Sequence, residues 1–154
     1  MSAPLATSTA TSQLTNIPGR AIVSARGHHF IVDSPPPLGG PNEEINPIDV
    51  LLGALATCGT FVCETAAIEE GIPLHSISLD VAGDFDPRGV CGDPVDPSIQ
   101  SLRLRLNLSG PTEEQAHFLA ESFRHRCPVY GTLAKSVPIE MDVVAIGPTT
   151  ENEQ

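Results

Sequence analysis

The feature that most constrains the fold is a long apolar segment, Pro47–Glu70, which carries the signals of a single helix. Asn46 can cap its first turn, Pro47 suits the first helical position, and Gly71 stands directly after its end. At roughly 1.5 Å per residue this helix is about 36 Å long. Residues 50–63 are apolar or small on nearly every side, which predicts a buried helix. A chain of 154 residues has little else to surround it, so we expect a homo-oligomer in which a second copy supplies the cover.

The same segment is not expected to cross a membrane, because Thr57, Gly59 and Thr60 interrupt it and Glu64 follows. Residues 1–12 contain no basic residue and no apolar stretch, so no secretory signal is expected. Four cysteines without such a signal indicate a reducing, cytoplasmic location. A net charge of −11 without any basic stretch argues against a nucleic-acid partner.

The remaining patterns predict an α+β fold, because strands and helices do not alternate as βαβ units. β-Branched residues around Gly27 predict a hairpin over Arg20–Asp33. A Pro- and Gly-rich loop without regular structure is expected over residues 34–47. Alternating apolar residues predict further strands at three places: residues 76–85, 101–109 and 138–146.

A second helix is expected after Thr112, which forms a capping box with Gln115. Its apolar residues recur at helical spacing and should face the core: Ala116, Leu119, Ala120 and Phe123. Pro128 ends or bends it. We therefore expect one domain over residues 13–147, between disordered tails at 1–12 and 148–154.

The four cysteines differ in their surroundings. Cys58 and Cys63 lie five residues apart on one helix, about 140° around it, so they cannot bridge and Cys63 is assigned to the core. Cys91 lies in a Gly- and Pro-rich loop, and Cys127 lies at a helix end in the most basic part of the chain. Considered one at a time, each cysteine is interpreted as a small, buried hydrophobic residue.

A nucleophilic role for Cys58 needs a cation, because an ordinary thiol has a pKa near 8.5 and is mostly protonated at neutral pH. Cys58 lies about three turns into its helix, beyond the reach of the terminal dipole. Arg20 and Arg26 in the first hairpin are the candidate cations, and each can also be read as a solvated strand charge.

No metal site is expected. His28 and His29 are adjacent in a strand and point to opposite faces, so they cannot chelate together. His125 and Cys127 make half a site, but no second Cys/His pair lies at zinc spacing.

Three segments, in the same order, resemble signatures of the OsmC/Ohr family: LGGPNEEINPIDVLLGALATC, AIEEGIPLHSISLDVAGDFDPRG and FRHRCPVYGTL. The resemblance runs from about residue 20 to 146. It implies an OsmC-like α+β fold with antiparallel sheets around a long central helix, in a swapped homodimer with two active sites at the interface. It also implies a cysteine-based peroxidase for organic hydroperoxides, with hydrogen peroxide as a further substrate, in oxidative or osmotic stress defence.

Carried over residue by residue, the resemblance makes Cys58 the peroxidatic thiolate and Cys127 the resolving thiol. Arg20 follows a glycine, as the family arginine often does, and is preferred over Arg26 as the activating cation. The implied chemistry passes through a Cys58 sulfenic acid and a Cys58–Cys127 disulfide, which an external dithiol reduces. It requires no metal and no organic cofactor.

One position departs from the family pattern. Peroxidatic members carry a glutamate directly after Asn-Pro, where it orients the arginine, and this chain has Ile48 there. Asp49 or Glu44 could take its place, although one step along a helix turns Asp49 by about 100°. The departure places the chain nearer the broad OsmC-like branch than the Ohr branch. It also leaves an alternative, a non-enzymatic redox-sensing or apolar-ligand-binding dimer with the same fold.

Overall fold

The computed structural model describes residues 3–147, which form two compact units that divide between Val50 and Leu51. The first unit holds a three-stranded sheet in the order β1-β2-β3 (Thr11–Leu14, Arg20–Ala25, His28–Asp33) and the short 3-10 helix η1 (Pro36–Leu38). The helix α1 (Pro47–Glu70) begins in this unit and continues through the second. The single domain predicted over 13–147 stays a prediction, and the tail at 148–154 lies outside the described residues.

The predicted hairpin is confirmed, and its turn explains its register. Arg26 and Gly27 both have positive φ angles, 53° and 81°, so they form the two-residue turn that matches the twist of the strands. This turn pairs Ala25 with His28 and, five residues further, Arg20 with Asp33. The strand β1 was not predicted; it begins at Thr11, inside the segment 1–12 that was expected to be disordered.

The expectation that residues 34–47 contain no regular structure is wrong over Pro36–Leu38. Proline has a fixed φ that is compatible with a helical turn, and the turn ends at Gly39 with a φ of 79°. The loop residues after Gly39 then lead to α1, whose predicted bounds are confirmed.

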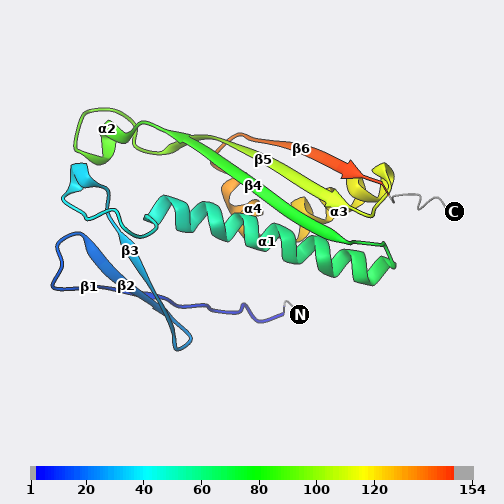
Figure 1. Cartoon of the computed structure of the whole chain (residues 1–154), viewed down its shortest axis with the longest axis horizontal. Helices are drawn as coiled ribbons and strands as arrows, with labels where there is room; N and C mark the ends of the chain where they lie inside the picture. Colours follow the sequence, from blue (N-terminus) through cyan, green and yellow to red (C-terminus); the bar gives the residue numbers. More distant parts are fainter. Residues whose placement is uncertain (1–2, 148–154) are drawn as a thin grey trace, which may run out of the picture. The chain divides into compact units, whose positions relative to one another are not determined.

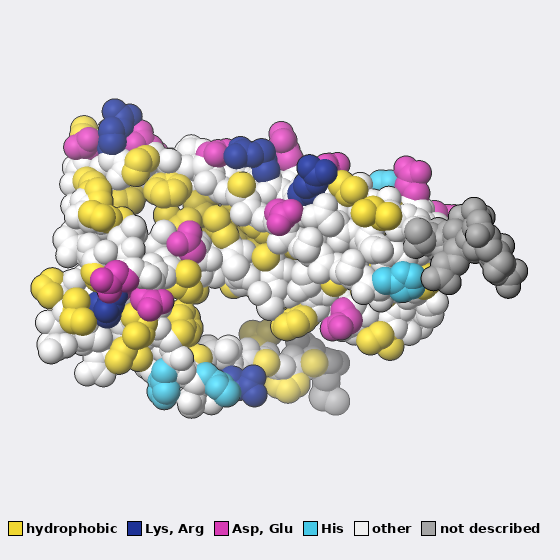
Figure 2. Space-filling view, viewed as in Figure 1, with side chains coloured by type: hydrophobic (Ala, Val, Ile, Leu, Met, Phe, Trp, Pro, Cys, Tyr) yellow, Lys and Arg dark blue, Asp and Glu magenta, His cyan; other side chains and the backbone are white. Residues whose placement is uncertain are grey.

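The second unit contains a sheet in the order β4-β5-β6 (Ser76–Phe85, Ile99–Ser109, Ile139–Ile146), with helices against one face (Figure 1). The four leucines on alternate positions of β5 are buried: Leu102, Leu104, Leu106 and Leu108. They pack against α1 and α3 (Glu113–Arg126), whose predicted capping box and buried face are confirmed. The other face of the sheet is polar, and acidic and basic side chains lie side by side on it (Figure 2).

The expectation of purely antiparallel sheets is wrong for one pair of strands. The strands β4 and β5 are antiparallel, whereas β5 and β6 are parallel. The cause is the connection between β5 and β6, which runs through α3 and the short helix α4 (Pro128–Leu133) and returns the chain in the same direction. A further short helix, α2 (Pro87–Val90), lies in the turn-rich connection between β4 and β5.

Within one chain, α1 is covered on one side only. Its buried residues form a stripe at helical spacing: Leu55, Gly59, Cys63, Ala66 and Ala67. On the rest of the helix Phe61 is 62% exposed and Ile68 is 76% exposed. By length and composition alone α1 is long and apolar enough to cross a membrane, although the sequence analysis did not expect a membrane span here. One such helix is weak evidence, because the core helix of a soluble protein meets the same criterion.

Candidate active site

Cys58 owes its position to the way α1 begins. The side chain of Asn46 accepts hydrogen bonds from the backbone N–H groups of Ile48 (2.9 Å) and Asp49 (3.0 Å). In return Asp49 accepts one from the N–H of Asn46 at 3.0 Å, which closes a reciprocal cap. The capped helix carries Cys58 about three turns further on, where its side chain is partly buried against the core.

Cys127 is the single residue between two helices. Pro128 prevents α3 from continuing, so Cys127 adopts extended backbone angles, φ −84° and ψ 115°. Its Sγ accepts a hydrogen bond from the N–H of Tyr130 at 3.3 Å and thereby caps α4. The residue is only 3% exposed.

The structure brings these two cysteines together. The S–H of Cys127 donates to the Sγ of Cys58 across 2.7 Å, and both are free thiols. Burial and, secondly, this hydrogen bond raise the pKa of Cys127 to about 11. Cys127 therefore stays protonated at neutral pH.

The other two cysteines take no part in this pair. Cys63 is fully buried, its S–H donates to the carbonyl of Leu119 at 3.5 Å, and desolvation raises its pKa to about 12. It is a core residue, as its spacing from Cys58 indicated. Cys91 is exposed at the end of α2.

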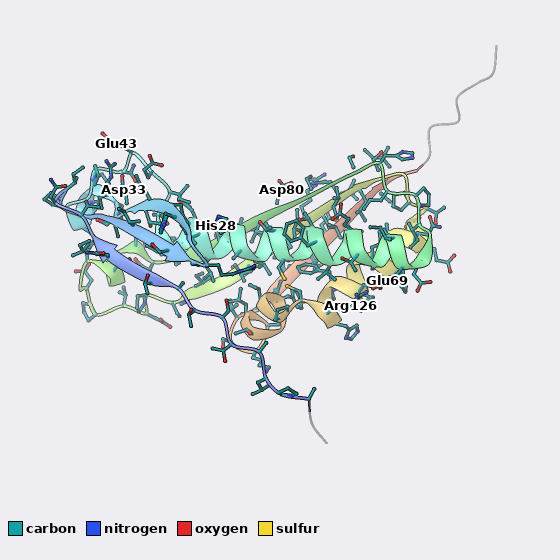
Figure 3. All side chains as sticks on the ribbon, turned by 90° about the horizontal axis from the view of Figure 1, so that it is seen from below. His28, Asp33, Glu43, Glu69, Asp80 and Arg126 are labelled. Atoms are coloured by element: carbon teal, nitrogen blue, oxygen red, sulfur yellow. The ribbon has the colours of Figure 1, made fainter. Side chains whose placement is uncertain are left out.

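Arg20 lies at the start of β2 and is held by two carboxylates. Its Nε donates to Oδ1 of Asp33 and its Nη2 to Oδ2 of Asp33, each at 2.8 Å. The same Nη2 donates to Oε2 of Glu43, also at 2.8 Å. Asp33 and Glu43 lie close together at the end of the first sheet (Figure 3). These bonds raise the pKa of Arg20 and keep it charged.

Neither predicted substitute for the family glutamate pairs with Arg20. Asp49 is used in the cap of α1, and Glu44 contributes only its backbone N–H, which donates to Asp33 at 3.1 Å. Asp33 and Glu43 were missed by the sequence analysis. A signal for Asp33 was available, because a two-residue turn at 26–27 places residue 33 opposite residue 20. The other candidate cation, Arg26, lies exposed in that turn.

Acid is expected to remove the stabilisation that Asp33 provides. The hydrogen bonds from Arg20 lower the pKa of Asp33 from 3.8 to about 2. As the pH falls, the carboxylate of Asp33 is protonated at a higher pH in the unfolded chain than in the folded protein. Its contribution to the free energy of unfolding is therefore complete above about pH 4 and is lost as the pH falls toward 2. Thermal unfolding of the wild type and of Asp33→Asn should therefore differ less as the pH falls over this range. A difference in melting temperature that stays constant would contradict the expectation.

A hollow of about 310 Å³ adjoins α4 in the second unit, lined by Leu51, Pro128, Val129, Thr132 and Leu133. Four of these five side chains are apolar, so the hollow suits a hydrocarbon group. A second hollow, of about 500 Å³, lies in the first unit against one face of its sheet. Among residues 3–147, no three His, Cys, Asp or Glu side chains are grouped so that they could hold a metal ion.

Solved structures with the same fold are numerous. An OsmC-like protein from Mycoplasma pneumoniae superposes with a TM-score of 0.78 at 16% identity, covering 92% of this chain and 98% of its own. An organic hydroperoxide resistance protein OsmC from Legionella pneumophila has a TM-score of 0.70 at 19% identity, covering 92% and 99%. An organic hydroperoxide resistance protein from Elizabethkingia anophelis has a TM-score of 0.72 at 20% identity, covering 93% of this chain and 99% of its own. At these identities the likeness establishes the fold.

Sequence comparison identifies the family directly. No curated protein matches the chain at a significant level. A family model described as OsmC-like protein matches residues 40–142, which is more than half of the chain and includes both Cys58 and Cys127. The chain therefore belongs to the OsmC-like protein family.

Proposed function

We propose that this protein is a thiol-dependent peroxidase that reduces organic hydroperoxides, and hydrogen peroxide as a second substrate. The observation that carries the proposal is the contact between the two thiols, 2.7 Å from Sγ to Sγ, formed by residues 69 positions apart. Oxidation of such a pair to a disulfide supplies the two electrons that reduce one hydroperoxide, and reduction of the disulfide restores the two thiols. Three of the structural relatives are named organic hydroperoxide resistance proteins, which supports the same chemistry.

The first step is attack by the Cys58 thiolate on the terminal oxygen of the hydroperoxide, the oxygen that carries the hydrogen. The S–O bond forms as the O–O bond breaks, the alkoxide takes a proton and leaves as an alcohol, and Cys58 becomes a sulfenic acid. We assign to Arg20 the stabilisation of the thiolate and of the developing negative charge on oxygen. The apolar hollow beside α4 is the proposed place for the alkyl group, because each buried methylene contributes about 0.8 kcal/mol.

The second step joins the two sulfurs. The thiol of Cys127 attacks the sulfenic sulfur of Cys58, its proton and the hydroxyl group leave as water, and a disulfide forms. An external dithiol then reduces this disulfide and is itself oxidised. Cys58 is partly exposed and Cys127 is 3% exposed, so the external thiolate reaches the sulfur of Cys58 and Cys127 is the leaving group.

The test is to oxidise the protein with one equivalent of cumene hydroperoxide and to identify the products by mass spectrometry. The wild type should contain a Cys58–Cys127 disulfide. Cys127→Ser should instead complete one turnover and retain a sulfenic acid on Cys58, because no thiol remains to condense with it. Wild-type protein whose thiols are untouched by the hydroperoxide would refute the proposal.

The same experiment separates this proposal from a non-enzymatic alternative. A redox-sensing or apolar-ligand-binding protein is favoured by the hollow of about 500 Å³ in the first unit, which is lined mainly by apolar side chains. The absence of a glutamate at the position of Ile48 also pointed to this alternative. The pairing of Arg20 with Asp33 and Glu43 supplies carboxylates from other positions, so that argument no longer favours the alternative.

We further propose that the protein acts in the cytoplasm as a swapped homodimer. The apolar residues Phe61 and Ile68, exposed on α1 in the single chain, support a second copy as their cover. The proposed partners are the hydroperoxide and the external dithiol, with no nucleic acid and no membrane. Four free cysteines support a reducing compartment.

A further inference from the structure

We infer that Asp33 is the positioning residue of Arg20, fixing the direction of its guanidinium so that one edge stays available to the reacting groups. The inference rests on the proposed function, in which Arg20 takes part in the peroxidase reaction. It gives Asp33 the role that the family assigns to a glutamate at the position of Ile48.

The contacts of Asp33 are those of a rigid anchor. Both of its oxygens accept from the same guanidinium, through Nε and Nη2, so the fork of Arg20 cannot rotate. Its Oδ2 also accepts from the backbone N–H groups of Glu43 (3.0 Å) and Glu44 (3.1 Å). The carboxylate therefore accepts four hydrogen bonds, and the residue is 1% exposed.

The backbone around Asp33 is held on both sides as well. The N–H of Asp33 donates to the carbonyl of Ile45 at 3.0 Å, and the N–H of Ser34 donates to the carbonyl of Gly19 at 2.8 Å. Asp33 therefore joins the end of β3, the start of β2 and the loop before α1. A carboxylate on such a frame fixes its partner better than one on a free loop.

Glu43 holds Arg20 less firmly. It provides one hydrogen bond, and its side chain is 70% exposed, compared with 0% for the side chain of Asp33. An exposed ion pair of this kind contributes little, because water screens it and two flexible side chains must be ordered. Asp33 is therefore the residue on which the orientation of Arg20 depends.

The N–H groups of Arg20 that bind neither carboxylate indicate why its orientation matters. No acceptor is found for Nη1 among residues 3–147, so its two N–H groups remain available. With two carboxylates beside one guanidinium, the cluster carries a net charge of −1. Because the two carboxylates offset the charge of Arg20, the stabilisation assigned to it depends on hydrogen bonds that the guanidinium directs at the reacting groups, and directed bonds depend on the anchor.

The test is a double-mutant cycle on kcat/KM for cumene hydroperoxide, using Asp33→Asn, Arg20→Met and the double variant. We expect each single variant to lose about 100-fold, because a bidentate charged pair is broken. The double variant should lie within about threefold of either, since Arg20 contributes nothing once its anchor is gone. Asp84→Asn is the matched control, because Asp84 pairs with Arg103 on the exposed polar face of the second sheet, and its kcat/KM should not change.

Several outcomes would overturn the inference. One is a wild-type kcat/KM in Asp33→Asn. Another is multiplication of the two single losses in the double variant, which a structural role alone would produce. Should Asp33→Asn fail to unfold cooperatively, Arg20→Lys decides the question: it keeps the charge without the fork, and activity within about threefold of the wild type contradicts the inference.

Failure of the proposed function is recognised separately. If the wild type does not consume hydroperoxide, the peroxidase proposal is wrong, and NMR of the Arg20 Nε–H group still tests the anchor. The wild type should give a slowly exchanging Nε–H resonance that is lost in Asp33→Asn and unchanged in Asp84→Asn. A resonance that persists in Asp33→Asn would show that Asp33 does not hold Arg20.

Discussion

Replacement of Cys58 by serine is expected to abolish hydroperoxide consumption. The reaction needs a sulfur nucleophile, and a serine hydroxyl at the same place is protonated at neutral pH and forms no sulfenic acid. The change replaces one atom at a partly buried position, so the fold should survive it. The measurement is the rate at which cumene hydroperoxide disappears in the presence of excess dithiol.

Cys91→Ser is the matched control for this experiment, because Cys91 is exposed and lies outside the thiol pair. It should retain the wild-type rate. Undiminished turnover by Cys58→Ser would refute the assignment of the nucleophile. Loss of activity in Cys91→Ser instead would move the reactive thiol to the connection between β4 and β5.

The largest loss of stability is expected from Phe123→Ala. Phe123 is fully buried on α3, and its ring meets the ring of Tyr130 edge to face with centroids 5.2 Å apart. It also lies directly over Gly59 of α1, where an added Cβ would come within 2.9 Å of its Cζ. Removing the ring leaves a cavity between α1 and α3, which costs about 3–5 kcal/mol of the free energy of unfolding.

Equilibrium unfolding in urea measures this loss, and Phe118→Ala on the same helix is its control. Phe118 is 44% exposed, so its truncation leaves no buried cavity and should lower the free energy of unfolding by less than about 1 kcal/mol. Equal losses from the two variants would contradict the placement of the core between α1 and α3.

The features that could be predicted from the sequence depend on residues close together in the chain. The bounds of α1 followed from Asn46, Pro47 and Gly71. The start of α3 followed from the Thr112–Gln115 capping box and its end from Pro128. The buried leucines of β5 followed from strict alternation. Each of these signals is complete within a few residues, because hydrogen bonds of caps and the periodicity of side chains act locally.

The features that were missed depend on how distant segments meet. The strand β1 carries a polar sequence and exists through its backbone pairing with β2, which side-chain patterns do not reveal. The parallel pairing of β6 with β5 depends on the path of the chain through α3 and α4. The partner of Arg20 was sought next to Ile48, whereas the hairpin register supplied Asp33.

By itself, the sequence determined the α+β class, the long helix that carries Cys58, the helix end that carries Cys127, and the resemblance to the OsmC-like family. Only the tertiary structure decided that the two sulfurs lie 2.7 Å apart and that Asp33 and Glu43 hold Arg20. The physical reason is that helix capping and side-chain periodicity depend on interactions between residues that are close together in the sequence. A contact between residues 69 positions apart exists only where the packing of the whole unit, around residues such as Phe123 and Gly59, brings them together.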